Sequence, residues 1–354
     1  MRALVCLLAS ACFSLGCQAA PKPCCHRAST GYLPIEEMVG MLSVQVRAEQ
    51  FEGVRKIGDR ILPSPDARFP DGRWVLPVFY DALDDGLSRA ATGEADWTRY
   101  EQALTAMTER RPDSSTAWLM LATLHLSHAW SVRGGGTIDT VDDASLARFR
   151  ALLARARALL DQHKEALVSN PQWYAMRLDI GGASSESRAN VQAIFDEGVQ
   201  RWPAYQPIWL TRLHYLAPKW GGSTAQMVDL VARAGRTPTE TDGVGLVARL
   251  LWAADRDDAL DLVRQPGIDW PLVKKSQDDV LDRYPDNVNV QLAVLEACHR
   301  PDKPETARLL ARMENAPDFM TLGSRLDLFQ QCIAWANDKR PDARAPEGLV
   351  SPGR

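Results

Sequence analysis

The chain has 354 residues, 45% of them hydrophobic and 24% charged, and its formal net charge at pH 7 is -4. This composition is typical of a folded globular protein, and the slight negative charge gives no overall attraction to nucleic acid. Beyond the N-terminal residues, no stretch is long and apolar enough to be a transmembrane helix.

Residues 1–19, MRALVCLLASACFSLGCQA, have the pattern of a secretory signal peptide: a positive charge, a short apolar run and small residues. Gly16-Cys17 resembles the end of a bacterial lipobox, which predicts cleavage before Cys17 and lipid attachment to its thiol. Gln18 at the next position favours the outer membrane over the inner one. Cleavage after Ala19 or Ala20 is the alternative. We therefore expect an exported protein, either an outer-membrane lipoprotein facing the periplasm or a soluble periplasmic protein.

Residues 20–32 are predicted to be a flexible tether, because PKPCCHRAST is rich in proline and polar residues. Cys24 and Cys25 lie there without a second cluster that could complete a metal site, so we predict none. Cys298 and Cys332 are the cysteines that remain in the folded region. An exported chain meets an oxidising compartment, so these two thiols are predicted to form a disulfide.

Residues 33–338 are predicted to be helical throughout. Ile35, Met38, Leu42 and Val46 share one helix face, and a second apolar face runs over residues 146–167 behind an N-terminal cap at Asp142. No segment shows the alternation and turn residues of a β-sheet. The sequence therefore predicts an all-α protein, followed by a disordered tail over residues 339–354.

Four prolines divide the helical region, each at a point where one helical pattern ends and the next begins: Pro112, Pro171, Pro203 and Pro285. Proline cannot continue the first helix but suits the first turn of the second. The middle two are 32 residues apart, near the tetratricopeptide period of about 34. We predict a degenerate tetratricopeptide-like solenoid of stacked antiparallel helix pairs.

Five segments carry a resemblance to a known family: DGRWVLPVFYDAL (71–83), HAWSVRGGGTIDTV (128–141), NPQWYAMRLDI (170–180), YLAPKWGGS (215–223) and RYPDNVNVQLAVLEAC (283–298). In this order they resemble the bacterial family called domain of unknown function 4034, over roughly residues 35–315. The resemblance implies a helical, tetratricopeptide-like fold and no established reaction.

The second of these segments contains the residues that look most like a site. Gly134 follows the end of a predicted helix, which favours a helix terminator over a phosphate loop. Arg133 is expected to interact with the last helical carbonyls and with Asp139 or Asp142. The alternative is an enzyme, possibly a metal-dependent hydrolase, centred on His125, His128 and Arg133, but no third metal ligand is evident.

Aromatic residues are the other unusual feature, with 11 tryptophans in the chain. As candidate binding or structural residues we single out Trp130, Trp173, Tyr174 and Trp220, which either pack between helices or line an aromatic groove. The adjacent carboxylates Asp84-Asp85 and Asp257-Asp258 diverge on a helix, so they are expected to be solvated surface. No catalytic residue, cofactor or metal ligand is predicted.

These features together predict a cell-envelope scaffold whose concave face binds a protein or peptide partner. A lipid anchor on Cys17 would attach it to the membrane.

Overall fold

The computed structural model describes residues 32–64, 66–137, 140–184, 186–258, 261–318, 322–340 and 343–346. In these ranges the regular secondary structure is helical, apart from two isolated β-bridges, so the predicted all-α class is confirmed. The described helices run from Ile35 to Asn337. The predicted signal peptide with Cys17, and the cysteines of the predicted tether, lie outside the described residues.

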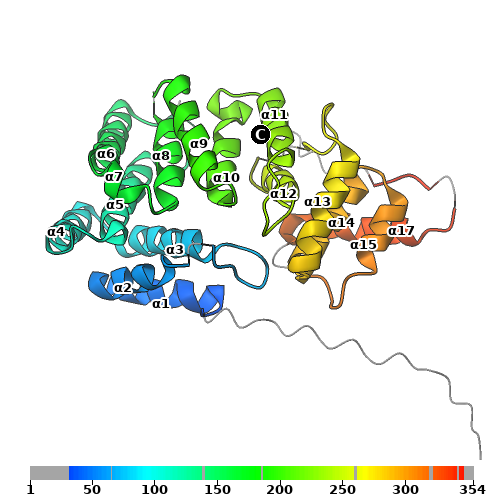
Figure 1. The fold of residues 1–354 in the computed structure, drawn as a ribbon, viewed down its shortest axis with the longest axis horizontal. Coiled ribbons are helices and arrows are strands. Elements are labelled where there is room, and N and C mark those ends of the chain that lie inside the picture. The colour runs from blue at the N-terminus through cyan, green and yellow to red at the C-terminus, as the bar shows by residue number, and fades with distance from the viewer. Residues whose placement is uncertain are drawn as a thin grey trace, which may run out of the picture.

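The helices form two layers, an inner row and an outer row (Figure 1). The chain starts with α1 (Ile35–Arg47) and α2 (Phe51–Ile61). The inner helices are α3 (Val75–Ala90), α5 (Ser115–Arg133), α8 (Gln172–Ala183), α10 (Gln206–Tyr215), α12 (Leu246–Asp258) and α14 (Asn287–His299). The outer helices are α4 (Glu94–Arg110), α6 (Asp143–Gln162), α9 (Arg188–Arg201), α11 (Thr224–Gly235), α13 (Trp270–Arg283) and α15 (Lys303–Leu310). The remaining elements are α7 (Lys164–Leu167), η2 (Pro218–Trp220), η3 (Gly323–Arg325) and α17 (Leu326–Asn337).

Burial distinguishes the inner helices from the outer ones. In α5 every residue from Ser115 to Ala129 except Trp118 is buried, so apolar neighbours surround this helix. Outer helices such as α9 bury one stripe, here Val191, Phe195 and Val199. A helix that is apolar all round must be covered on all sides, whereas an amphipathic helix can face water. The inner helices therefore lie in the interior, and the outer helices cover them on one side.

The four prolines found in the sequence stand in the connections that lead into inner helices, namely α5, α8, α10 and α14. Two of these connections share a further contact. The Trp118 indole N–H donates to the Pro112 carbonyl at 3.0 Å, and the Trp209 indole N–H donates to the Pro203 carbonyl at 3.1 Å. In both cases the tryptophan lies six residues after the proline. The repeated contact supports the helical-repeat architecture.

One predicted helix is shorter than the pattern over residues 146–167 suggests. Asp142 caps it as expected, since its Oδ1 accepts from the Ser145 N–H at 2.9 Å. The helix α6 ends before His163, whose backbone leaves the helical region at φ -106° and ψ 16°. The His163 ring stacks on Trp118 with 3.8 Å between centroids. The chain restarts as α7, so the prediction of one continuous helix was wrong in its last turns.

The loop between α2 and α3 ties the two ends of the inner row together; we call its residues 66–74 the latch. Arg68 Nη2 donates to Asp242 Oδ2 at 2.8 Å, across 174 residues of sequence. The Asp71 carbonyl accepts from Arg249 at 2.8 Å and from Asn289 at 2.9 Å. In Figure 1 this loop extends from α3 toward α12 to α14. The latch therefore closes the curved inner row around a central space.

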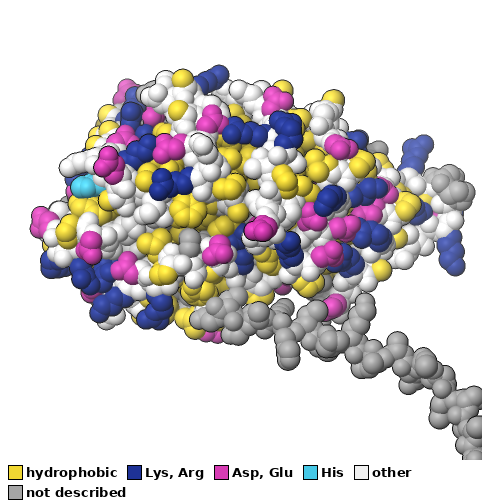
Figure 2. All heavy atoms as spheres, in the orientation of Figure 1, with side chains coloured by type: hydrophobic (Ala, Val, Ile, Leu, Met, Phe, Trp, Pro, Cys, Tyr) yellow, Lys and Arg dark blue, Asp and Glu magenta, His cyan; other side chains and the backbone are white. Residues whose placement is uncertain are grey.

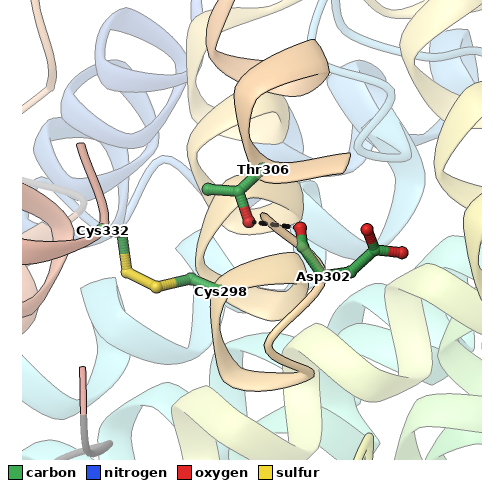
Figure 3. The surroundings of a disulfide bond; sticks show 4 residues. All are labelled: Cys298, Asp302, Thr306 and Cys332. Carbon is green, nitrogen blue, oxygen red and sulfur yellow. Dashed lines mark hydrogen bonds between the residues drawn. A yellow bond between two sulfur atoms is a disulfide. The ribbon is translucent and has the colours of Figure 1, made fainter. Parts of the chain in front are cut away.

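A disulfide joins the C-terminal helices α14 and α17 (Figure 3). Its residues are Cys298 and Cys332, the pair singled out from the sequence, and their Cα atoms are 5.9 Å apart. Both side chains are buried in the C-terminal core. Beside them, the Thr306 hydroxyl donates to the Asp302 carbonyl at 2.9 Å at the start of α15. The bridge thus holds α17 against the last inner helix.

Candidate functional site

A cavity of about 520 Å³ lies where the inner helices face the latch. Residues of α3, α5, α8, α10, α12 and α14 line it. Its walls are largely apolar and aromatic, with Trp74, Met176 and Trp252 among them. The volume lies within the range of about 300–1,000 Å³ that small-ligand sites usually have. On the face seen in Figure 2, apolar side chains gather between α3 and the row α8, α10 and α12, and charged ones surround them.

The five sequence motifs converge on this cavity. The first, second, third and fifth each contribute to its lining, through residues such as Trp74, Trp130, Met176 and Leu292. The fourth motif reaches it indirectly, because the Tyr215 hydroxyl donates to Asp179 Oδ1 at 2.6 Å and Asp179 lines the cavity. Motifs far apart in the chain therefore build one site, which makes this cavity the candidate functional site.

Three carboxylates line the cavity. Asp81 and Asp84 lie one helical turn apart on α3, and Asp179 comes from α8. Asp84 accepts a hydrogen bond from the Ser127 hydroxyl, and Asp179 accepts one from Tyr215. No donor among the described residues reaches the Asp81 carboxylate, and no ion pair in the described chain involves any of the three. Their negative charge is left without a counter-ion from those residues.

The surroundings of these carboxylates disfavour their charged form. Burial raises the pKa of Asp81, Asp84 and Asp179 above the usual value, and neighbouring carboxylates raise each of them further. By their accessible surface Asp81 and Asp84 are exposed on the cavity wall, so water screens much of this effect. A positive charge brought into the cavity would favour the ionised form of these carboxyl groups and lower their pKa values again.

We expect Asp81→Asn to stabilise the protein at neutral pH and not at acid pH. The pKa of Asp81 is raised from 3.8 to about 7, so ionisation costs stability as the pH rises through this window. The amide is neutral throughout. With solvent screening, we expect a gain of about 0.5–1 kcal/mol at pH 8 that disappears near pH 4, measured by urea unfolding. Asp85→Asn is the control, because Asp85 pairs with Arg89 outside the cavity. A gain of equal size at both pH values would contradict this explanation.

The aromatic candidates from the sequence divide between the cavity and the core. Trp130 lines the cavity. Trp173 is 1% exposed and donates to the Leu160 carbonyl at 3.0 Å, and the Tyr174 hydroxyl donates to Glu197 at 2.9 Å. Trp220 packs against Tyr215 beside a smaller cavity of about 140 Å³. Of these four residues, therefore, one lines the candidate site.

The two histidines of α5 face away from the cavity, toward α4 and α6. The His128 ring stacks on Trp97 with 4.7 Å between centroids, and its Nε2 lies 3.3 Å from Glu94 Oε1. His125 is buried, and this burial lowers its pKa to about 4. In the part of the chain that the structure describes, no three His, Cys, Asp or Glu side chains are placed to hold a metal ion. The described residues therefore offer no third metal ligand beside His125 and His128, as the hydrolase hypothesis would require.

Arg133 belongs to the loop that follows α5. Its Nη1 donates to the Gly134 carbonyl at 3.0 Å and to the Gly136 carbonyl at 3.1 Å. The expected ion pair with Asp142 is not formed, because that carboxylate caps α6 instead, and Asp139 lies outside the described residues. The guanidinium lies 5.4 Å from the centre of the Trp130 ring. Arg133 thus stabilises the conformation of this loop and lies next to Trp130, which lines the cavity.

We expect Gly134→Ala to lower the free energy of unfolding by about 1–3 kcal/mol, since residues other than glycine rarely adopt its backbone conformation. Gly134 has φ 70° and ψ -179°. A methyl group there would meet no atom within 4 Å, so the cost is backbone strain alone. Gly135→Ala is the matched control, because its methyl group also meets nothing and its φ is not positive. Equal urea-unfolding midpoints for the two variants would contradict the explanation.

The cavity carboxylates were missed in the sequence because acidic residues on helices are usually solvated. Asp84 is exposed, as predicted for a solvated carboxylate, but it also lines the cavity, whereas Asp85 pairs with Arg89 at 2.7 Å. The side chains of Asp257 and Asp258 lie outside the described residues. The available signal was the spacing of Pro77, Asp81 and Asp84, which share one face of a helix inside the first motif.

No protein-family model matches the chain, and no curated protein or solved structure matches it either. The resemblance to domain of unknown function 4034 therefore stays a prediction that rests on the five motifs.

Proposed function

We propose that the protein is a binding scaffold whose cavity receives a segment of another protein or a peptide. The observation that carries this proposal is that four of the five separate sequence motifs line one cavity of about 520 Å³, and the remaining motif forms a hydrogen bond with a lining residue. Helical-repeat proteins commonly bind partners on the concave side of their stacked helices. This argument from the architecture supports a binding role and does not indicate any particular reaction.

The character of the walls suits a peptide. Trp74, Met176 and Trp252 offer apolar surface, while Gln172 and Thr211 add polar groups along the same cavity. A peptide needs both, because its side chains bury apolar area and its backbone amides must keep hydrogen-bond partners. The polar groups would also fix the direction in which the segment lies.

The test is to fill the cavity. Leu210 lines it from α10 and is only half-buried, so Leu210→Trp occupies cavity space with little repacking. Peptides selected by phage display on the wild-type protein should bind this variant about tenfold more weakly or worse, as measured by calorimetry, since the larger ring occupies their site. Ala193→Trp, on the exposed side of α9, is the control. Equal binding to both variants, or no selected peptide, would contradict the proposal.

We further propose that the scaffold works in the cell envelope. Among the described helices none combines the length and apolar character needed to cross a membrane. The sequence at Gly16-Cys17 is what supports attachment through lipid.

Cys17→Ser should abolish labelling by a radioactive fatty acid and release the protein from membranes, because the thiol is the attachment point. The measurement compares labelled wild type and variant after cell fractionation. Equal labelling of the two proteins, or none in either, would leave a soluble periplasmic protein as the remaining hypothesis.

A further inference from the structure

We infer that the cavity recognises a lysine or arginine side chain of the bound segment, through Asp81, Asp84 and Asp179. This inference rests on the proposed function and adds the chemical class of the ligand. All three carboxylates line the same cavity. Within the described chain they form no ion pair, and Asp81 accepts no hydrogen bond. Asp81 and Asp84 are exposed to the solvent of the cavity, so water solvates them in the free protein, and a cationic ligand that displaces this water would supply their counter-charge.

The cationic side chains of the cavity are already engaged elsewhere. Arg73 pairs with Asp71 at 2.6 Å on the exposed side of the latch. Arg249 donates to Asn289 Oδ1 and to the Asp71 carbonyl, each at 2.8 Å. Both arginines therefore hold the latch and its contacts with α12 and α14. They do not neutralise the carboxylates on α3 and α8.

A second, independent feature points to a ligand. Gln206 lines the cavity and is 7% exposed, yet no described residue forms a hydrogen bond with its side-chain amide. Its neighbour Gln172 is 8% exposed and accepts a hydrogen bond from the Tyr205 hydroxyl at 2.5 Å. Neither atom of this amide belongs to the fully buried unpaired groups of the described chain, so the amide reaches the solvent of the cavity and can exchange a water for a ligand group. The Gln206 amide can pair with the backbone of a peptide lying beside the carboxylates.

The arrangement fits an organic cation better than a metal ion. The described residues place no three His, Cys, Asp or Glu side chains around one point, so the carboxylates are spread along the wall. An ammonium or guanidinium group carries several N–H donors and can meet such separated acceptors. Its methylene stem can lie against apolar wall residues such as Leu126 and Met176.

The test uses immobilised protein and four pools of acetylated pentapeptides. Each pool has a defined central residue, lysine, arginine, norleucine or glutamate, between mixtures of uncharged residues. Norleucine keeps an apolar stem like that of lysine and lacks the charge. Retained peptides are quantified by mass spectrometry on the wild-type protein, on Asp81→Asn/Asp179→Asn, and on Asp85→Asn, which removes a charge from α3 outside the cavity.

We expect lysine or arginine peptides to be retained about tenfold more than norleucine peptides, the ratio expected for one charge-assisted hydrogen bond. The double variant should lose this preference, while Asp85→Asn should keep it. Thermal melts of each variant confirm that it is folded. Retention without a preference for the cation would overturn this inference alone, and so would a preference that survives in the double variant. No retention of any pool would overturn the proposed function as well.

Discussion

Arg68→Ala should lower the free energy of unfolding by about 3–5 kcal/mol, because it leaves the Asp242 carboxylate buried without its ion-pair partner. The two side chains are 7% and 8% exposed, and their N–O distance is 2.8 Å. The guanidinium also lies over the Trp74 ring, 3.1 Å from its centre. Loss of Arg68 therefore removes the ion-pair partner of Asp242 and also the side chain that packs on Trp74, which lines the cavity.

The cost arises from the unpaired partner and not from a strongly stabilising pair. Burial lowers the pKa of Arg68 by more than Asp242 raises it, so desolvation outweighs the attraction between the two charges. Replacing both residues by apolar ones of similar size should then recover most of the lost stability. We expect Arg68→Met/Asp242→Leu to be more stable than Arg68→Ala.

Urea unfolding of the single and double variants measures this effect. Arg89→Ala is the control, because Arg89 pairs with Asp85 on the surface, with exposed fractions of 72% and 37%. Its loss should cost no more than about 0.5 kcal/mol. If Arg68→Ala cost as little as Arg89→Ala, the latch would not be what joins the two ends of the inner row.

Removing the disulfide should be the second large effect. We expect Cys298→Ala/Cys332→Ala to lower the free energy of unfolding by about 2–4 kcal/mol, because a bridge mainly restricts the unfolded chain. The bridge closes a loop with a sequence separation of 34 residues. Alanine fits these buried positions without adding bulk or a polar group, so the effect reports mainly the missing bond.

Denaturation with and without dithiothreitol provides the comparison. Reduced wild type should unfold at nearly the same denaturant concentration as the double alanine variant, and reductant should leave the variant unchanged. Thiol counting in denaturant without reductant checks the bond directly. Two free thiols assigned to Cys298 and Cys332 would refute it.

Local sequence patterns were enough to predict most of the helices and the divisions between them. The apolar spacing over residues 35–46 predicts α1, and Pro112, Pro171, Pro203 and Pro285 mark the entries to inner helices. These features depend on local rules, since helical hydrogen bonds join residues four apart and proline acts on its own helical turn. Pairing Cys298 with Cys332 was possible for a different reason, because elimination left no other cysteine in the folded region.

Which side chains share the cavity depends on long-range packing, which no local pattern reveals. In α5, Trp130 lines the cavity whereas His125 and His128 face the outer helices. The sequence could not distinguish these faces, because an inner helix is buried around almost its whole circumference and shows no polar side that would set its orientation. The latch pair Arg68 and Asp242 is separated by 174 residues, and no local pattern joins residues so far apart. The carboxylates on α3 and α8 line the same cavity for the same reason, since the fold of the inner row brings these helices to it.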